Sequence, residues 1–389
     1  MKKLKNVLAV VFISGLFAVG AITVFSPRKT FSEQERRPLA KWPSFSFEKI
    51  ISGEFFKDFD SALADQFTGR NELLGLKAST QKTLGKKDNS RVYFGKDNYL
   101  IEIHENLDEK QLQMNMEDML SFYQDKFLKE SNPQEASLII APTVAGAQVE
   151  LLPKYAVEAN QEEILAKANG IFSGTEVLIP DVLENFKSYK AGKEEDKGLY
   201  FRTDHHWTQK GAYIAFKSWL DKSEFTNLEE EYNLDEITNS FYGTTWAKAN
   251  SKAIPADTIT AYKNTDLNEV ELYDIEGELI RKGIYNEKAA DSRDPYEYFI
   301  GENKDYIKLI TATDTKESQG RHLLIFKDSY ANAFIPFLCP YYESITVIDL
   351  RFLKTDLGKI MEKEEFTDLL FLYNVVTFSD DNNSYKLIK

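Results

Sequence analysis

Two of the four histidines in the chain stand side by side within the segment FRTDHHWT, which begins at Phe201. An extended apolar run precedes this segment and a helical pattern follows it, so we expect a strand-to-helix turn. If the backbone stays extended here, Asp204 and His206 project to one side and His205 to the other. A carboxylate two residues from an imidazole can fix its tautomer and stabilise the imidazolium. The pattern predicts His206 as a general base that Asp204 orients.

A second segment offers a nucleophile for that base. The apolar run 323–326 is followed by Lys327, Asp328 and Ser329, and then by a helical pattern. This order predicts a strand, a turn and a helix, with the serine at the C-terminal edge of a sheet, where open α/β folds bind ligands. The free N–H groups at a helix start can hold an oxyanion. A serine nucleophile needs a base, and the base needs an orienting group, so the two segments together predict a catalytic triad.

Both segments also have plainer explanations. Thr208 is a natural N-cap, and Asp328 or Ser329 can simply cap the helix that follows. The Asp-His-His cluster could bind a metal ion, but adjacent histidines rarely chelate one ion, and no further ligand lies at the usual spacing. The triad prediction therefore requires no metal and no cofactor.

Short apolar runs alternate with helical patterns in the C-terminal two thirds of the chain. Strands are expected at 137–141, 177–179, 199–202, 323–326, 345–348 and 369–373, and helices at 209–220 and 353–363. Such alternation predicts a parallel sheet covered by helices on both faces. We expect residues 131–389 to form this α/β domain, with a mostly β insertion at about 228–300. Residues 31–130 are expected to form a mainly helical segment that packs on the core.

The N-terminus predicts a membrane anchor. Lys2, Lys3 and Lys5 precede an uncharged run from Val7 to Phe25, close to the roughly 20 residues that a span needs. The basic flank places the N-terminus in the cytoplasm, so the α/β domain of this single-pass cell-membrane protein would be extracytoplasmic. Residues 1–30 would form the anchor and stalk. The alternative is a cleaved signal peptide, although the end of the run is too bulky for the usual cleavage site.

Composition excludes some classes of partner. The 389 residues are 42% hydrophobic and 28% charged, enough for a large core, and the net charge is -14. A negative field of that size argues against nucleic acid or anionic lipid as the main partner. The one cysteine, Cys339, can form no internal disulfide and lies in an apolar stretch typical of a core.

The segment 203–208 resembles the signature of the DHHW protein family of Gram-positive bacteria. That family is similar to the SGNH-hydrolase-like domains of alginate O-acetylation proteins. Further short motifs resemble the family in the same order along the chain, at residues 31–33, 37–40, 65–70, 241–244, 301–303, 327–332 and 349–351. The resemblance implies an SGNH-hydrolase-like three-layer sandwich with a central parallel sheet.

The resemblance also implies residue roles. Ser329 would be the nucleophile, His206 the base and Asp204 the orienting carboxylate. This chain departs from ordinary SGNH enzymes in two respects. The serine follows Lys-Asp rather than Gly-Asp, and the usual oxyanion glycine and asparagine blocks are not evident in the sequence.

Substrate-binding or oxyanion residues are expected around this triad. Arg351 falls where related acetylation enzymes carry a functional arginine, although a surface salt bridge would explain it at least as well. Asn303 and Asn374 are both candidates for the oxyanion asparagine, and Tyr330, next to the nucleophile, is a further candidate.

The resemblance implies a cell-surface serine O-acetyltransferase or acetylesterase that acts on a polysaccharide. It also implies a membrane-bound O-acyltransferase as the acetyl donor, because acetyl-CoA is cytoplasmic. The alternative is a catalytically inactive, carbohydrate-binding component of an envelope polysaccharide assembly. Acylation of Ser329 by an activated ester would distinguish the two.

Overall fold

The computed structural model describes residues 2–32, 34–189, 198–228, 231–250 and 254–389. The chain divides into two compact units. Unit 1 comprises residues 1–89 and 246–255, and unit 2 comprises residues 90–245 and 256–389.

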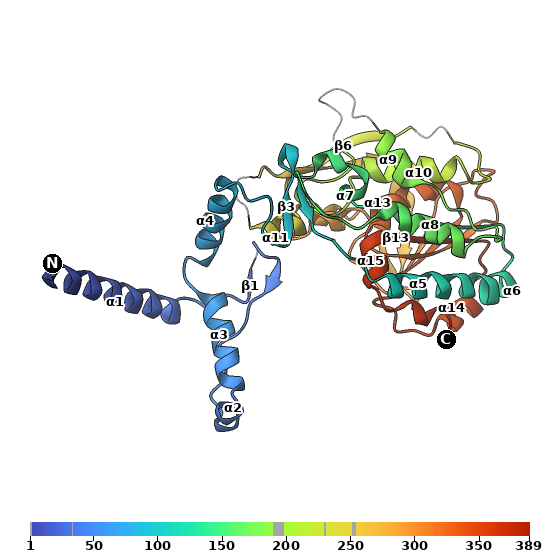
Figure 1. Ribbon diagram of the computed structural model, residues 1–389. Coiled ribbons are helices and arrows are strands. Elements are labelled where there is room, and N and C mark those ends of the chain that lie inside the picture. Colours follow the sequence, from blue (N-terminus) through green and yellow to red (C-terminus); the bar gives the residue numbers. More distant parts are fainter. Residues whose placement is uncertain (1, 33, 190–197, 229–230, 251–253) are drawn as a thin grey trace. The chain divides into compact units, whose positions relative to one another are not determined.

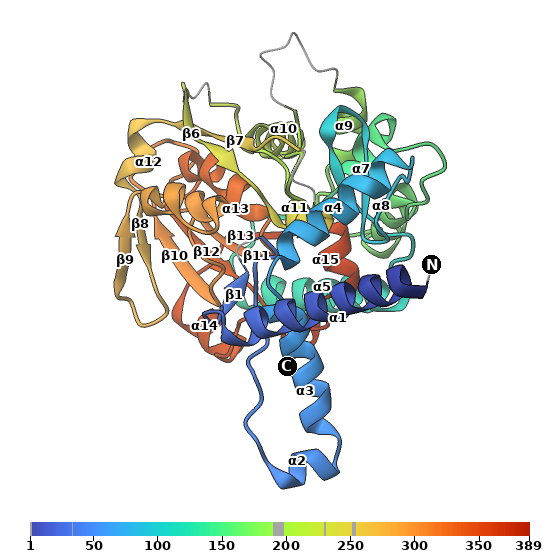
Figure 2. The same ribbon diagram turned by 90° about the vertical axis from the view of Figure 1, so that its left-hand side faces the viewer.

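Among the described residues, the centre of unit 2 is a seven-stranded sheet with the order β5-β13-β11-β12-β10-β8-β9 (Figure 2). Four neighbouring strands are parallel: β5 (Glu135–Ala141), β13 (Asp368–Asn374), β11 (His322–Lys327) and β12 (Ser344–Ile348). The other three continue the sheet antiparallel: β10 (Tyr306–Ile310), β8 (Glu271–Tyr273) and β9 (Leu279–Lys282). β11, which leads to Ser329, therefore lies between two parallel neighbours.

Both faces of this sheet are covered, because alternate side chains of the buried strands enter two separate apolar clusters. Ile139, Ile325 and Leu372 pack on one face with α9 (Val182–Ser188), α10 (Gln209–Leu220) and α13 (Ala331–Phe334). Leu138, Phe326 and Phe371 pack on the other face. The helices there are α5 (Glu109–Phe122), α8 (Gln161–Ile171), α14 (Leu357–Lys363) and α15 (Val375–Asp380). Figure 1 shows α9 and α10 above the sheet and α5 and α14 below it.

The predicted α/β sandwich is confirmed, but the sheet is mixed rather than wholly parallel. Its antiparallel edge includes β8 and β9, which form a hairpin within the predicted insertion. These two strands are antiparallel because a short hairpin cannot join parallel strands. Two expected strands are reduced to single bridges, Leu178 with Ser137 and Tyr200 with Trp207. The insertion also holds α11 (Thr244–Ala249), α12 (Thr265–Glu269) and a separate pair, β6 (Asn233–Phe241) and β7 (Asp257–Lys263).

The expected domain boundary at residue 130 lies inside unit 2. The hairpin of β3 (Val92–Phe94) and β4 (Leu100–Glu102) and the buried face of α5 belong to the core clusters of this unit. Met116 and Phe122, for example, are buried on the helix, and the Phe122 ring meets the Phe326 ring of β11 edge-on at 5.1 Å. Residues 90–130 are therefore part of the α/β unit. Its remaining short helices are α6 (Leu128–Glu130) and α7 (Val144–Ala147).

Unit 1 contains the N-terminal helix α1 (Lys2–Phe25), which is long and apolar enough to cross a membrane and is almost wholly exposed. A signal sequence would have the same properties, so the anchor remains a prediction. The other elements are β1 (Phe31–Ser32), β2 (Arg37–Pro38), α2 (Phe47–Ile51), α3 (Glu54–Gln66) and α4 (Arg70–Thr83).

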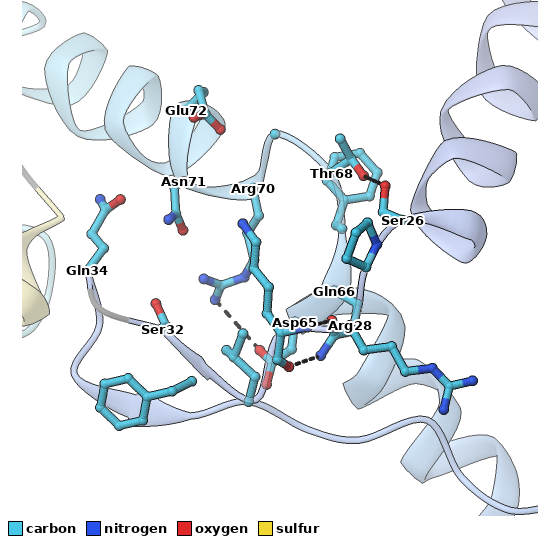
Figure 3. Close-up of a pocket in the computed structure, with 16 residues that line it drawn as sticks. Ser26, Arg28, Ser32, Gln34, Asp65, Gln66, Thr68, Arg70, Asn71 and Glu72 are labelled. Carbon is cyan, nitrogen blue, oxygen red and sulfur yellow. Dashed lines mark hydrogen bonds and ion pairs between the residues drawn. The ribbon is translucent and has the colours of Figure 1, made fainter.

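Ion pairs fasten these elements of unit 1 to one another. The guanidinium of Arg37 binds both oxygens of Asp65, at 2.9 and 2.6 Å, and Arg70 binds Glu35. The hydrogen bonds from Arg37 hold the pKa of the Asp65 carboxyl below its usual value. Asp65 and Arg70 line a cavity of about 480 Å³ (Figure 3). The motifs at 37–40 and 65–70 are thus explained by the fold of this unit.

Candidate active site

Ser329 lies directly after the central strand β11, at the C-terminal edge of the sheet. Its turn is fixed by the buried carboxylate of Asp328, which accepts the N–H of Tyr330 at 2.9 Å and the N–H of Asn374 at 2.8 Å. The second bond comes from the end of β13, so the neighbouring strand locks the turn. The serine itself is half-buried.

The Asp-His-His segment does not stay extended as expected. The chain bends between residues 202 and 206, and the side chain of Asp204 accepts the backbone N–H of His206 at 3.0 Å. Asp and Asn favour such turns because their side chains can bond the backbone two residues on. After the bend, the hydroxyl of Thr208 caps α10 by accepting the N–H of Gly211 at 3.2 Å.

The structure brings together the three residues predicted as a triad. The Nε2 atom of His206 lies 2.7 Å from the Oγ atom of Ser329, and its Nδ1 atom lies 2.5 Å from Oδ1 of Asp204. Because a carboxylate can only accept, Nδ1 carries the proton in the neutral imidazole. Nε2 is then the acceptor for the serine hydroxyl. This is the arrangement that a general base needs.

Asp204 is held by the chain around Thr244. Its second oxygen accepts the N–H of Thr244 at 2.8 Å and the hydroxyl of the same residue at 3.1 Å. Burial alone would raise the pKa of the Asp204 carboxyl, but the charges of His205 and His206 and these hydrogen bonds hold it well below its usual value. The ionised form of Asp204 is the one that can accept the Nδ1 proton of His206 and stabilise an imidazolium.

His205 lies beside the triad but outside its hydrogen-bond chain. Its Nδ1 atom lies 2.7 Å from the hydroxyl of Thr244, and its ring centroid lies 3.9 Å from that of His206. The ligand atoms of Asp204, His205 and His206 lie within 4.8 Å of one another, so the cluster could hold a metal ion. Both ring nitrogens of His206 already have partners in Asp204 and Ser329, however, and the arrangement fits the triad better.

Arg351 and Asn303 belong to a polar cluster beneath the nucleophile turn. Arg351 forms a two-point ion pair with Asp349, at 2.9 and 2.6 Å, and because Asp349 is buried this is not the surface salt bridge of the alternative. The side-chain oxygen of Asn303 accepts from Lys327 at 2.7 Å and from Asn332 at 3.3 Å. Lys327 is buried, which lowers its pKa to about 8. Both residues before the serine therefore have internal partners: Lys327 donates to Asn303 and Asn332, and Asp328 accepts from Tyr330 and Asn374.

The other two candidates also have internal partners. Tyr330 donates its N–H to Asp328 and its hydroxyl to the carbonyl of His205. The side chain of Asn374 caps α15 and donates to the carbonyl of Ala141 at 3.2 Å. All four residues remain predictions as substrate-binding or oxyanion groups, and in this arrangement each has a role in fixing the loops at the sheet edge.

Several residues that shape the site carry no chemical signal in the sequence. Gly243 and Thr244 belong to a motif of the resemblance, but only the fold shows that they wrap the Asp204 carboxylate. Asp257 accepts the backbone N–H groups of Arg202 at 3.1 Å and of Thr203 at 2.7 Å, and so fixes the start of the bend. Tyr296 stacks on His206 with ring centroids 3.8 Å apart. The motif at 241–244 and the place of these residues inside the predicted insertion were the available hints in the sequence.

Two family models match regions of the chain that contain residues of this site. The model described as DHHW protein matches residues 182–348, which include all three members of the triad. This confirms the resemblance to the DHHW family. The SGNH hydrolase-like domain of the acetyltransferase AlgX matches residues 92–233, which include the Asp-His-His segment. The DHHW match therefore contains all three residues predicted as base, orienting carboxylate and nucleophile, although it covers less than half of the chain.

Solved structures show the same fold. A DHHW family protein from Eubacterium siraeum has a TM-score of 0.61 and 22% sequence identity, over 75% of this chain and 92% of that chain. PatB1 from Bacillus cereus, solved with a sulfonyl adduct, has a TM-score of 0.56 and 19% identity, over 73% of this chain and 96% of that chain. No curated protein matches the sequence. The DHHW region thus lies in a fold shared with proteins of low sequence identity.

Proposed function

We propose that this protein is a cell-surface serine O-acetyltransferase or acetylesterase that acts on a polysaccharide. The observation that carries the proposal is the unbroken hydrogen-bond chain from Asp204 through His206 to the hydroxyl of Ser329. The similarity to the SGNH hydrolase-like domain of the acetyltransferase AlgX supports acyl transfer rather than another reaction of an activated serine.

The first half-reaction would acylate the serine. Nε2 of His206 takes the hydroxyl proton while Oγ of Ser329 attacks the carbonyl carbon of an acetyl ester, which gives a tetrahedral oxyanion. The ester C–O bond then breaks, and the departing alcohol takes the proton from His206. An acetyl group remains on Ser329. The ionised Asp204 stabilises the imidazolium between these two proton transfers.

The second half-reaction reverses these steps with a new acceptor. His206 takes a proton from a sugar hydroxyl or from water, and the resulting oxygen attacks the acetyl carbonyl. The bond between the acetyl carbon and Oγ of Ser329 then breaks, and the imidazolium of His206 returns a proton to Oγ. Transfer to a sugar yields an O-acetylated polysaccharide, whereas transfer to water yields acetate. Ser329 is half-buried at the sheet edge, so both acceptors are compatible with the site.

The location of the reaction follows from α1 if this helix anchors the chain. The site would then face the outside of the cell membrane, where acetyl-CoA is absent. A membrane-bound O-acyltransferase that delivers acetyl groups across the membrane would supply the donor. A polysaccharide of the cell envelope would be the acceptor within reach of an anchored enzyme.

4-Nitrophenyl acetate tests the triad without knowledge of the polymer, because this activated ester needs little recognition. Protein lacking the N-terminal helix should hydrolyse it slowly. Ser329→Ala and His206→Ala should each abolish turnover, since nucleophile and base act as a unit. Asp204→Asn should leave a small residual rate, because it disturbs tautomer and orientation only. A sulfonyl fluoride should label Ser329, seen as an added mass on its peptide, as the sulfonyl adduct of PatB1 suggests.

His322 provides a matched control, because it lies at the opposite end of the same strand and its Nδ1 atom contacts Ser344 at 2.9 Å. His322→Ala should keep turnover near the wild-type rate. His205→Ala should cost much less than His206→Ala. Wild-type turnover in Ser329→Ala would refute the serine mechanism. A folded but inactive wild type that also resists the sulfonyl fluoride would instead support the carbohydrate-binding alternative, and activity restored by zinc after chelation would support the metal alternative.

A further inference from the structure

One face of the His206 imidazole is covered by a tyrosine from the insertion. The ring of Tyr296 lies parallel to the imidazole, with 3.8 Å between the centroids and 10° between the planes. The ring of His205 lies 3.9 Å from His206, and two rings at such distances cannot share one face. The imidazole is therefore held between Tyr296 and His205, with its edges directed at Asp204 and Ser329.

The local sequence fixes Tyr296 in this position. It lies in the 3₁₀-helix η5 (Pro295–Tyr298), which begins with proline at the first position and with an Asp294 side chain that accepts the N–H of Tyr296 at 3.3 Å. The rings of Phe201 and Phe299 meet the tyrosine edge-on, with centroids 6.4 and 5.2 Å away. These contacts leave the buried ring no alternative orientation.

Tyr296 also touches the nucleophile. Its hydroxyl donates to the backbone carbonyl of Ser329 at 3.2 Å. Burial raises the pKa of Tyr296 well above its usual value, so the hydroxyl remains a neutral donor. One side chain thus contacts both the base and the backbone of the nucleophile.

We propose that Tyr296 is a positioning residue for acyl transfer: its ring holds the His206 imidazole between Asp204 and Ser329, and its π face stabilises the imidazolium that forms when Ser329 gives up its proton. This inference rests on the proposed function. The negative face of an aromatic ring attracts a cation at this distance, and the attraction grows where water is excluded. A neutral imidazole gains little from it, so the effect favours the transition state over the ground state.

A series of ring-fluorinated phenylalanines at position 296 tests this, because fluorine withdraws the negative charge of the ring face with little change of shape. Tyr296→Phe should keep kcat within about 3-fold, since the N–H of Asn332 also donates to the Ser329 carbonyl, at 3.2 Å. Each further fluorine should lower kcat for 4-nitrophenyl acetate while KM stays constant. The whole series should span about 10-fold, within the range of such interactions.

Tyr298 is a matched control in the same short helix. It is equally buried, stacks on Tyr285 at 5.1 Å and donates to Glu287 at 3.0 Å. The same fluorinated series at position 298 should leave kcat constant. Tyr296→Leu should also shift or broaden the proton NMR signal of the Nδ1–H group of His206, and Tyr298→Leu should not.

The outcomes separate this inference from the proposed function. A constant kcat across the fluorinated series at position 296, in a protein whose turnover depends on Ser329, would overturn the electrostatic role while the proposed function stands. An unchanged Nδ1–H signal in Tyr296→Leu would overturn the positioning role. A wild type without Ser329-dependent turnover would refute the proposed function, and the NMR comparison would still decide whether Tyr296 positions the imidazole.

Discussion

Gly243→Ala should disable the site through a single methyl group. A Cβ atom at this position would lie 2.2 Å from both Cβ and Oδ2 of Asp204, far inside an ordinary contact of about 3.4 Å. The backbone of Gly243 cannot retreat easily, because the next residue, Thr244, donates its N–H to the same carboxylate at 2.8 Å. We therefore expect the Asp204 carboxylate to move, and His206 with it.

The displacement sets the size of the effect. Relief of the clash requires a movement of about 1 Å, the difference between 2.2 Å and an ordinary contact. A misplacement of that size in an active site costs about 100-fold in rate, or about 2.7 kcal/mol in the barrier. Overpacking of a buried position also costs about 1–3 kcal/mol of stability. The variant should fold with a lowered Tm and hydrolyse 4-nitrophenyl acetate about 100-fold more slowly than the wild type.

Gly170→Ala is the matched control, because a Cβ atom at this position in α8 meets nothing within 4 Å. It should keep the wild-type kcat and raise stability by at most about 1 kcal/mol, as glycine-to-alanine changes in helices do. Thermal unfolding and steady-state kinetics on the two variants give both quantities. A Gly243→Ala protein with the wild-type kcat would show that Asp204 need not occupy its present position, and would refute the orienting role assigned to it.

Two further outcomes are expected. The full-length chain should fractionate with membranes and a chain starting near Phe31 should be soluble, whereas a mature N-terminus just after Phe25 would reveal a signal peptide instead. Burial raises the pKa of Glu135 to about 7 in the folded protein, against roughly 4.3 in an unfolded chain. The folded state therefore binds the proton more tightly, and this stabilisation is full below about pH 4 and is lost as the pH rises through 7. Between pH 4 and 8 the free energy of unfolding of the wild type should fall by up to about 3 kcal/mol relative to that of Glu135→Gln, measured by denaturant titration at each pH. If the two free energies change with pH in parallel, the raised pKa of Glu135 is contradicted.

The sequence contained enough information for the sheet centre and for the expectation that Asp204, His206 and Ser329 lie together. The strands at 137–141, 323–326, 345–348 and 369–373 are buried on both faces, so their runs are almost wholly apolar and easy to read. Ser329 could be placed because it follows one of these runs. The antiparallel edge could not be predicted, because β8 and β9 are short and partly exposed and their patterns also fit a separate hairpin.

The supporting residues were beyond sequence reasoning for a different physical reason. Tyr296 lies against His206 and Gly243 lies against Asp204, in each case from a segment distant in the chain. Contacts of this kind leave no periodic pattern in the sequence. The bend at Asp204 shows the same limit. An extended chain was expected to separate the two histidines onto opposite sides, but the side chain of Asp204 turns the backbone and brings the two rings to 3.9 Å.

The site is assembled from segments that are bonded to one another as well as to the sheet. Trp207 donates to the carbonyl of Tyr330 at 2.9 Å, Tyr296 donates to that of Ser329, and Thr244 donates to the Asp204 carboxylate. Each bond joins two loops at or beside the nucleophile and base, so no member of the triad depends on a single loop for its position. Because the imidazole already lies 2.7 Å from the serine hydroxyl, catalysis would need no rearrangement of the triad. If the proposed acyl transfer takes place here, the energy of substrate binding is available for placing the acyl donor and the acceptor.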